Sequence, residues 1–543
     1  MRLFVLTIVF TIATSAFCAT GYAQPAAQPP NIVLFVVDDM GWQDASVPFW
    51  TERAVNNDLY RTPNLERLAA QGMKFTRAYA AALCTPTRVS IMTGQNMARH
   101  RVTNWTMRLN VDQGQNHPRL VPPQWNINGL QPTGSNIART IEAPTLPHLL
   151  KETGYRTIHI GKAHLGAETT PGADPLNLGF DRNIGGHEAG GPGSYLGTNN
   201  FSAAFRSADR IWDVPHLKRY HGKDTFLTEA LTLEAIELVG EAVRDEKPFF
   251  LHMSHYAPHV PLEPDDRFIT RYRELGLPEP QARYAALIEG MDKSLGDIMA
   301  HLDTLEIADK TVVVFISDNG GMAGQGGLPE NQNTPLRSGK ESFFEGGIRI
   351  PMIVRWPGKT EAGAVNQTPV IVEDLYPTLL SIAGAVIPER ERNRIDGKDL
   401  GGIFRGNGDL PANRALVFHL PQQLYSGIGH EPFSVIVQGD WKLIYTFNHS
   451  QFQLYNLRED IGESNNLAAD KPKLVSQMAL TLARILRDRS AQCPVVKNGQ
   501  QIRLRIDGLA YHNGKLTLHA NETVTIHAGE EMPLIVPAVQ AGS

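Results

Sequence analysis

The sequence contains little cysteine: only Cys18, Cys84 and Cys493 among 543 residues. This scarcity excludes a small disulfide-stapled scaffold, and a chain of this length can bury a large core without covalent cross-links. If a leader that includes Cys18 is removed, Cys84 and Cys493 remain as one potential disulfide pair. Cysteine connectivity does not follow from spacing, so this pairing stays open beside a chemical role for a free Cys84.

The sequence also lacks an excess of positive charge. It has 51 Lys and Arg residues against 56 Asp and Glu residues, which gives a formal net charge of −5. Such a balance provides no bulk attraction for nucleic acid or for an anionic membrane surface, so we expect no nucleic-acid partner. An anionic substrate would require positive charge that is concentrated in one place.

Long apolar runs are absent after the N-terminus, so we expect no stable membrane insertion. Residues 1–23 combine Arg2, an apolar stretch and the small residues Gly21 and Ala23, a pattern that predicts a cleaved signal peptide. We therefore expect an exported bacterial protein, periplasmic or secreted, with a Pro/Ala/Gln linker over 24–30. The alternatives are an uncleaved anchor, for which the run is short, and a lipid anchor at Cys18, for which Phe17 is a poor neighbour.

Residues 31–410 alternate between two patterns. Continuous apolar, β-branched runs predict strands at 31–37, 155–160, 248–253, 311–316 and 350–355. Helical patterns lie at 62–72, 146–152, 225–243, 282–305 and 373–383. This alternation predicts an α/β fold with a large, mainly parallel sheet flanked by helices, in which ligands bind beyond the carboxyl ends of the strands.

The pattern changes after residue 410. The runs "ALVFHL", "FSVIVQGDWKLIYTF" and "QFQLYNL" predict antiparallel strands, with a turn at Gly439-Asp440 and a helix over 471–487. We interpret 411–490 as a smaller C-terminal α+β subdomain that contains an antiparallel sheet. Residues 491–543 form an extension with short hairpin patterns, to which the sequence assigns no role.

Acidic and amide side chains follow two of the predicted strands. Asp38 and Asp39 end the first strand, and Asp318 and Asn319 end "TVVVFIS" with the same layout. These hard oxygen ligands suit Ca²⁺ or Mg²⁺ better than zinc, and carboxylates crowded together without a cation would repel each other. A lone Asp-Asp pair is usually a cap or a turn, but its repetition at a second strand favours a metal site.

Basic groups follow the other strands. Lys162 and His164 come just after one strand and His255 and His259 after another, while Arg88 and Lys340 lie elsewhere in the chain. Each of these alone could be ordinary surface charge. Aimed together at a divalent cation, three fixed cations and two histidines predict a pocket for a tetrahedral oxyanion, sulfate or phosphate. These five residues are Arg88, Lys162, Lys340, His164 and His259, while His255 is only one of the polar groups at the strand ends.

These residues lie in motifs that resemble those of a known family. "CTPTR" followed by "VSIMTG" resembles the signature of the formylglycine-dependent sulfatases of the alkaline phosphatase superfamily. "DDMGWQD", "GYRTIHIGKAHLG", "APH", "DNGG" and "FFEGGIRIP" resemble the other motifs of that family in the same order, and "YNLREDIGESNNL" resembles its C-terminal element. The resemblance runs from about residue 31 to about residue 467. It departs from the family pattern at Thr87, where serine is commoner, and at Ile461, where the family has proline.

The resemblance implies an alkaline-phosphatase-like fold, with a mixed, mainly parallel sheet, and a catalytic domain over 31–410. It implies that Cys84 is oxidised to formylglycine during export, by a formylglycine-generating or sulfatase-maturating enzyme. One hydroxyl of the resulting gem-diol would attack sulfur, and the other would expel sulfate by collapse to the aldehyde. A Ca²⁺ ion would be held by Asp38, Asp39, Asp318, Asn319 and residue 84.

The resemblance also implies roles for the basic groups. Arg88, one helical turn beyond Cys84, would hold the diol, and Lys162 and Lys340 would neutralise the sulfuryl oxygens. His164 would take the proton that triggers sulfate release. His259 would assist the leaving alcohol as general acid, together with Lys340.

Two loop segments, 104–130 and 185–197, resemble loops of bacterial polysaccharide sulfatases, so we expect a sulfated carbohydrate as the substrate. Trp105, Trp125, His187 and Tyr195 are the residue types that stack on sugars and hydrogen-bond to them, and we predict them as substrate-binding residues. Packing within the loops is the equal alternative for these four. Two other functions stay open: a phosphonate or phosphate ester hydrolase of the same superfamily, and a non-catalytic glycan-binding protein with unconverted Cys84.

Overall fold

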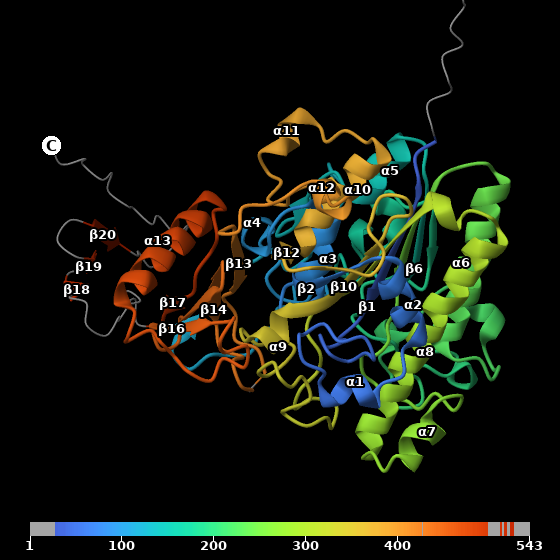
Figure 1. The fold of residues 1–543 in the computed structure, drawn as a ribbon, viewed down its shortest axis with the longest axis horizontal. Coiled ribbons are helices and arrows are strands. Elements are labelled where there is room, and N and C mark those ends of the chain that lie inside the picture. Colours follow the sequence, from blue (N-terminus) through green and yellow to red (C-terminus); the bar gives the residue numbers. More distant parts are fainter. Residues whose placement is uncertain (1–27, 426, 498–510, 513–514, 519–521, 526–543) are drawn as a thin grey trace, which may run out of the picture.

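The apolar runs form one mixed sheet that lies between layers of helices (Figure 1). The structure is a computed structural model that describes residues 28–425, 427–497, 511–512, 515–518 and 522–525. The predicted signal peptide at 1–23, most of the linker and Cys18 lie outside these residues. Within the described part of the chain, no helix combines the length and the apolar character that crossing a membrane requires.

The central sheet has nine strands in the described residues, in the order β11-β2-β10-β9-β1-β8-β6-β7, with β12 paired to β2. Their bounds are β1 Asn31–Val37, β2 Met73–Tyr79, β6 Arg156–Gly161, β7 Arg182–Ile184, β8 Phe249–Ser254, β9 Thr311–Ser317, β10 Arg349–Arg355, β11 Ala364–Asn366 and β12 Val370–Ile371. Strand β10 is antiparallel to β2 and β9, and the other neighbouring pairs are parallel. The predicted mixed, mainly parallel sheet is therefore confirmed. Strand β2 has no clear signal in the sequence, because Lys74, Thr76 and Arg77 interrupt its apolar positions.

Helices cover both faces of this sheet (Figure 1). Side chains of β1 alternate between the faces: Ile32, Leu34 and Val36 join one buried cluster, and the residues between them join another. The first cluster is covered by α3 Cys84–Thr93, α5 Leu146–Glu152 and α10 Leu375–Ala383, and the second by α2 Pro63–Gln71, α6 Leu227–Arg244 and α8 Glu279–Thr304. Each fully buried Val, Leu or Ile stabilises this arrangement by about 1.5–3 kcal/mol relative to exposure.

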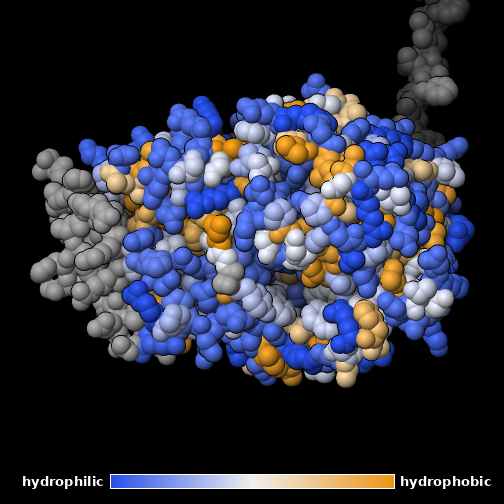
Figure 2. Space-filling model, turned by 90° about the horizontal axis from the view of Figure 1, so that it is seen from below, coloured by the Kyte–Doolittle hydropathy of each residue, from blue (hydrophilic) through white to orange (hydrophobic). Residues whose placement is uncertain are grey.

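Shorter elements connect these layers. They are α1 Val55–Leu59, α4 Met97–His100, α7 Ile269–Glu274, α9 Glu345–Ile348, α11 Glu389–Arg392, α12 Gly401–Phe404, β3 Leu120–Val121, β4 Leu130–Gln131 and β5 Ile141–Glu142. The surface over the core is mostly polar: in Figure 2, hydrophilic residues predominate on one face and hydrophobic residues are scattered among them.

The C-terminal region holds the predicted antiparallel sheet, at the left of Figure 1. Its strands are β13 Ala415–Leu420, β14 Phe433–Gln438, β15 Trp441–Thr446 and β16 Gln451–Asn456, and helix α13 Pro472–Asp488 follows them. One face of this sheet packs on α13 through Val417, Ile436 and Leu443. Its other face contributes residues such as Phe418 and Val435 to the first buried cluster of the main sheet, so the two sheets share a continuous core.

Buried charges join the two sheets as well. Lys442 Nζ on β15 lies 3.0 Å from Glu345 Oε1 on α9 and 2.8 Å from Glu463 Oε1, and none of the three side chains is exposed. Because a buried ion is costly unless it is paired, this trio ties the C-terminal sheet to α9, which directly precedes β10.

The last described segments belong to the predicted extension. Strand β17 Val495–Val496 pairs with β3, and β18 Tyr511–His512, β19 Lys515–Leu518 and β20 Glu522–Thr525 form an antiparallel sheet, as the hairpin patterns predict. The alternative of a Cys84–Cys493 disulfide is wrong for this structure. Cys84 is buried near the main sheet, Cys493 is partly buried against the cluster of Leu120, Tyr445 and Phe447, and neither forms a disulfide.

Candidate active site

Four neighbouring parallel strands end at one place. Strands β6, β8, β1 and β9 are adjacent in the sheet, and the chain leaves their carboxyl ends through Lys162, Ser254, Asp38 and Asp318. All four of these residues are buried. The predicted convergence of polar groups at this edge of the sheet is therefore confirmed.

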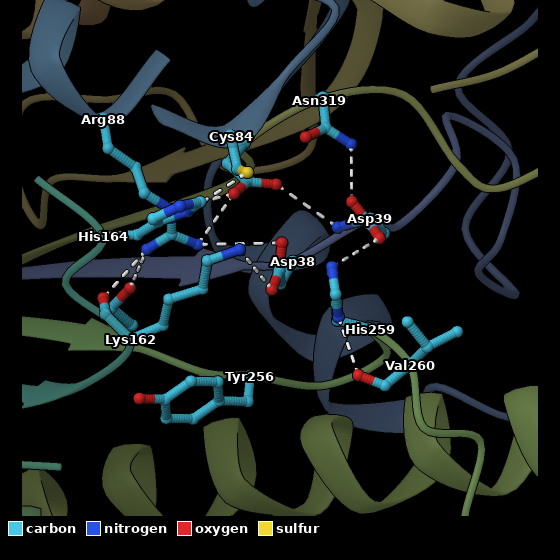
Figure 3. Close-up of polar contacts among 12 residues, drawn as sticks. Asp38, Asp39, Cys84, Arg88, Lys162, His164, Tyr256, His259, Val260 and Asn319 are labelled. Atoms are coloured by element: carbon cyan, nitrogen blue, oxygen red, sulfur yellow. Dashed lines mark hydrogen bonds and ion pairs between the residues drawn. The ribbon is translucent and has the colours of Figure 1, made fainter. Parts of the chain in front are cut away.

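Cys84 reaches the same edge from the helix side. It is the first residue of α3, after Leu83 in extended conformation, and its thiol is buried (Figure 3). Its Sγ lies 3.3 Å from Nδ1 of His164. Burial raises the pKa of the Cys84 thiol, although Lys162 and Lys340 oppose this shift. Because Cys84 is the first residue of α3, its side chain lies at a helix N-terminus, where the helix dipole favours negative charge.

Arg88 lies one turn further along α3 and holds several elements together. Its Nε donates to Asp318 Oδ2 at 2.9 Å, and its Nη1 donates to the Lys162 carbonyl at 2.9 Å and to Ser254 Oγ at 2.6 Å. The guanidinium is buried and thus fixed. Sequence reasoning missed Ser254, whose only signal is its position at the end of the strand that precedes "HYAPH".

The carboxylates of the site pair with its lysines. Lys162 Nζ lies 2.7 Å from Asp38 Oδ2, Lys340 Nζ lies 2.7 Å from Asp39 Oδ2, and Asn319 Nδ2 donates to Asp39 Oδ1 at 2.8 Å. Asp38 Oδ1 and Asn319 Oδ1 are buried and have no hydrogen-bond partner among the described residues. Buried oxygens of this kind usually have a partner, so both are available to a cation.

Burial and neighbouring charges act in opposite directions on the two aspartates. Burial, reinforced by the charge of Asp318, raises the pKa of Asp38 well above its ordinary value. Burial alone would also raise the pKa of Asp39, but Lys340, His259 and Lys162 together hold it below its ordinary value. The repulsion between Asp38 and Asp318 is the electrostatic reason why this set of oxygens suits a divalent cation.

The two predicted histidines have defined tautomers. His164 Nε2 lies 2.7 Å from the Thr106 carbonyl, which can only accept, so Nδ1 carries the lone pair that faces Cys84. His259 Nδ1 donates to the Val260 carbonyl at 2.8 Å, and its Nε2 lies 3.6 Å from Asp39 Oδ2. Burial, with Lys162 for His164 and Lys340 for His259, lowers the pKa of each ring, to about 3 for His259.

Not every polar residue after these strands belongs to the site. His255 Nε2 pairs with Ser294 Oγ on α8 at 2.8 Å, and its ring lies against Phe35 in the second buried cluster. The position of His255 just after β8 suggests a site residue, but its side chain packs in the core instead. His259 lies beyond Pro258, where the chain returns to the site.

The four predicted sugar-binding residues occupy different environments. Tyr195 is fully buried, and its hydroxyl donates to the carbonyls of Tyr256 and His259. Trp125 is 2% exposed and donates to Asp112, Trp105 packs against the first buried cluster, and His187 is 8% exposed. The burial of Tyr195 and Trp125 favours loop packing for these two, and sugar contact by any of the four stays a prediction.

The loop that precedes Tyr195 lies against both histidines. A Cβ added at Gly190 would lie 2.6 Å from His164 Cε1, and one added at Gly191 would lie 2.9 Å from His259 Nδ1. Only glycine therefore fits at these two positions without moving a ring. This close approach is a feature that the sequence pattern did not reveal.

Lysines, an arginine and buried carboxylates at the carboxyl edge of a parallel sheet define an enzyme that acts on an anionic ester. The comparisons with known proteins identify its family. The family profile described as Sulfatase matches residues 30–385, and that of the N-sulphoglucosamine sulphohydrolase C-terminal region matches residues 339–491. The chain belongs to the sulfatase family, and it is a sulfatase, an enzyme that hydrolyses sulfuric esters.

Relatives cover most of its length. A sulfatase of Formosa agariphila is 30% identical over 535 residues, which cover 89% of this chain and 92% of that protein. N-acetylgalactosamine-6-sulfatase of Canis lupus familiaris is 33% identical over 70% of this chain and 66% of its own length. The structure of Ps i-CgsB in complex with k-i-k-neocarrahexaose superimposes with a TM-score of 0.69 at 28% identity, over 85% of this chain and 94% of the other.

Proposed function

We infer that this sulfatase removes sulfate from a sulfated carbohydrate, with a formylglycine made from Cys84 and with a Ca²⁺ ion. The observation that carries the inference is the free, buried Cys84 at the start of α3, opposite the unprotonated Nδ1 of His164. A disulfide or a packing role would not require a base at this distance.

The residues present fit both groups. Asp38, Asp39, Asp318 and Asn319 would hold Ca²⁺, and the unpartnered oxygens of Asp38 and Asn319 support this assignment. The donor atoms of Asp38, Asp39 and His259 also lie within 4.8 Å of one another, but oxygen is the ligand that Ca²⁺ prefers to imidazole nitrogen. The bound ion would supply positive charge that polarises a sulfate oxygen, and the diol would supply two hydroxyls on one carbon.

The chain's own residues position and move protons. Arg88 would hold side-chain oxygens at position 84, because it starts one helical turn away and is fixed by Asp318 and Ser254. Lys162 and Lys340 would neutralise charge on the sulfuryl group from two sides. His164 Nδ1 would accept a proton from residue 84, and the Thr106 carbonyl keeps the ring in the tautomer that this requires.

The leaving alcohol needs a proton donor. His259 Nε2 can donate only when both ring nitrogens are protonated, because its Nδ1 proton is held by the Val260 carbonyl. Lys340 carries a proton in its ordinary charged state, and Asp39 raises the pKa of that amine against the effect of burial. Because the lowered pKa keeps the His259 ring neutral, we assign the proton donation to Lys340 and a supporting position beside the leaving oxygen to His259, since both side chains face Asp39 Oδ2.

Three lines support a carbohydrate substrate. The Canis lupus familiaris relative is named N-acetylgalactosamine-6-sulfatase, the Ps i-CgsB structure holds k-i-k-neocarrahexaose, and the leader sequence predicts export. Export as a periplasmic or secreted protein, and maturation of Cys84 by a formylglycine-generating or sulfatase-maturating enzyme on that route, are parts of the same proposal.

The test is a desulfation screen. The purified full chain is incubated with defined sulfated mono- and oligosaccharides, with an aryl sulfate and with a phosphate diester, and released sulfate or phosphate is measured. Sulfate release from a sugar supports the proposal, and the Cys84→Ala protein is the matched control. Faster turnover of the phosphate diester than of every sulfate would favour the ester hydrolase alternative. Binding of a sulfated sugar without turnover by protein that retains its Cys84 thiol would favour the glycan-binding alternative.

A further inference from the structure

A basic cavity lies away from the strand ends that carry the candidate active site. It has a volume of about 760 Å³ and is formed between the segment after α3, the loop around residues 133–144, helix α11 and the end of α13. Five arginines line it: Arg99, Arg101, Arg390, Arg394 and Arg489. This is the kind of local concentration of positive charge that a chain of net charge −5 would need to bind an anion.

The positive charge exceeds the negative charge around this cavity. Only two carboxylates line it, Glu142 and Glu391, and a third, Asp396, pairs with Arg99 at 2.8 Å and with Arg489 at 3.0 Å. Five guanidinium groups therefore face three carboxylates. Glu142 is engaged elsewhere, since it accepts from Ser135 Oγ at 2.7 Å and from neighbouring backbone amides.

Two of the arginines are exposed and form only long ion pairs with Glu391, so each can reach a ligand. Arg390 and Arg394 have side chains that are 76% and 56% exposed, and each lies only 3.6 Å from Glu391, beyond hydrogen-bond distance. A third donor, Nη1 of Arg489, is shielded from solvent and has no hydrogen-bond partner among the described residues. Arg101 already donates to the Ser490 carbonyl, which helps to close one side of the cavity.

The remaining walls suit a sugar better than a bare ion. Amide and hydroxyl side chains of Gln95, Asn126, Thr133 and Thr140 lie beside the apolar Ile137 and Ile141. The volume is in the range of pockets that hold whole organic ligands rather than a single inorganic anion. Guanidinium groups bind sulfate or carboxylate in a fixed fork, while amides and hydroxyls match sugar hydroxyls.

The cavity is separate from the candidate active site. Cys84 is at the start of α3, and Gln95 lies just beyond its last residue, so the ten residues of the helix put about 15 Å between them. Figure 1 shows α11 at the outer edge of the molecule, above the helices that cover the sheet. A polymer could thus contact this cavity with one segment and the catalytic residues with another.

We propose that this arginine cavity is a second binding site for an anionic saccharide segment, bearing sulfate or carboxylate groups, which holds a polymeric substrate away from the reacting ester. The choice of saccharide as ligand rests on the proposed function. The positive cavity itself does not, because it is built from residues that take no part in the catalytic step.

The test is a binding measurement without turnover. Full-length Cys84→Ala protein is titrated calorimetrically with a heparin hexasaccharide, at low salt and again at higher salt, with inorganic sulfate of equal ionic strength as competitor. The Arg390→Ala/Arg394→Ala change in this background should weaken one binding event by roughly tenfold. The affinity of that binding event should also fall as the salt concentration rises. Inorganic sulfate that carries the same total charge should not displace the hexasaccharide.

The matched control removes two exposed arginines elsewhere. Arg53→Ala/Arg458→Ala, whose side chains are 51% and 75% exposed, changes the net charge equally and should leave binding unchanged. Equal affinity of the cavity variant and the control would overturn the proposal, as would complete displacement of the hexasaccharide by inorganic sulfate. Thermal melting of each variant excludes unfolding as the cause. Failure of the parent enzyme to desulfate any sugar would instead count against the proposed function and would leave this result standing.

Discussion

His164 Nδ1 lies 3.3 Å from Cys84 Sγ, while Nε2 of the same ring lies 2.7 Å from the Thr106 carbonyl. The carbonyl thereby decides which nitrogen faces residue 84, and burial with the nearby Lys162 lowers the pKa of the ring so that it stays neutral. A neutral imidazole with its lone pair toward residue 84 can accept a proton from it.

Modification of Cys84 is expected in the active enzyme. The peptide covering residues 78–88 should lose its sulfur and react with hydrazides, which mass spectrometry measures. Cys84→Ala should fold and bind substrate but lack turnover, because no diol can form at alanine. Cys84→Ser should be nearly inactive as well, unless the host oxidises serine.

The control for Cys84 is the other described cysteine. Cys493→Ser should retain activity, since Cys493 packs beside Phe447 far along the chain from the catalytic motifs. Recovery of a Cys84–Cys493 disulfide from fully active protein would refute the assignment of residue 84 as the nucleophile.

The orientation of His164 should depend on Gly190. In Gly190→Ala, the new Cβ would lie 2.6 Å from His164 Cε1, so the ring must move away from residue 84. We expect kcat to fall by about 10- to 100-fold, because a displacement of about 1 Å at a reacting group has effects of this size. Steady-state kinetics and a thermal melt measure the two consequences separately.

A glycine in a helix supplies the comparison for Gly190. Gly240→Ala on α6 places its Cβ 3.4 Å from Arg244 Nη1, an ordinary contact, and alanine favours the helix. This variant should keep its activity and gain slightly in melting temperature. If Gly190→Ala were as active as Gly240→Ala, the close contact with His164 would have no catalytic importance.

The oxygen cluster should bind Ca²⁺. Strong chelation should abolish turnover, and added Ca²⁺ should restore it, because Asp38 and Asp318 repel each other without a cation. Metal content by elemental analysis and the melting temperature with and without Ca²⁺ provide readouts that do not depend on activity. Asp318→Ala should lose both metal and turnover, whereas Asp303→Ala, an exposed carboxylate, should lose neither. Full activity in metal-free protein, or stoichiometric zinc in native protein, would contradict this site.

The buried Lys442 should be important for stability rather than chemistry. Lys442→Met leaves the carboxylate of Glu463 buried without its cation, while Glu345 keeps Arg349 at 3.3 Å, and this should cost about 3–5 kcal/mol of unfolding free energy. Burial raises the pKa of Glu463 to about 7 even with Lys442 present. A raised folded-state pKa means that the stability contributed by Glu463 is complete below about pH 4.5 and is lost as the pH rises through 7.

The destabilisation by Lys442→Met should therefore grow with pH. Without Lys442 the pKa of Glu463 rises further, so the loss of melting temperature should be larger at pH 8 than at pH 6. The double variant Lys442→Met/Glu463→Gln should recover part of the loss and most of the pH dependence. An equal loss at both pH values would mean that the cost comes from packing and not from an uncompensated charge.

Local sequence determined the strands and helices of the central layers well. Strand 31–37 and helix 146–152 have the predicted bounds, because a continuous apolar run and a helical apolar spacing report burial directly. The proposed metal ligands were equally evident, since Asp38, Asp39, Asp318 and Asn319 follow strands whose ends must meet once the sheet is parallel. Strand β2 was harder to predict because its charged, partly buried Lys74 and Arg77 disguise its buried positions.

Tertiary structure alone decided which polar groups meet and in what state. Sequence placed His255 and His259 together, but the chain turns His255 onto Ser294 and brings His259 to Asp39. The sequence could not assign the proton on His164, the approach of Gly190 to that ring, or the five arginines that α4, α11 and α13 with the residues after them bring to one cavity. The physical reason is that residue type and periodicity report burial, whereas hydrogen-bond partners, tautomers and local charge depend on contacts between segments hundreds of residues apart.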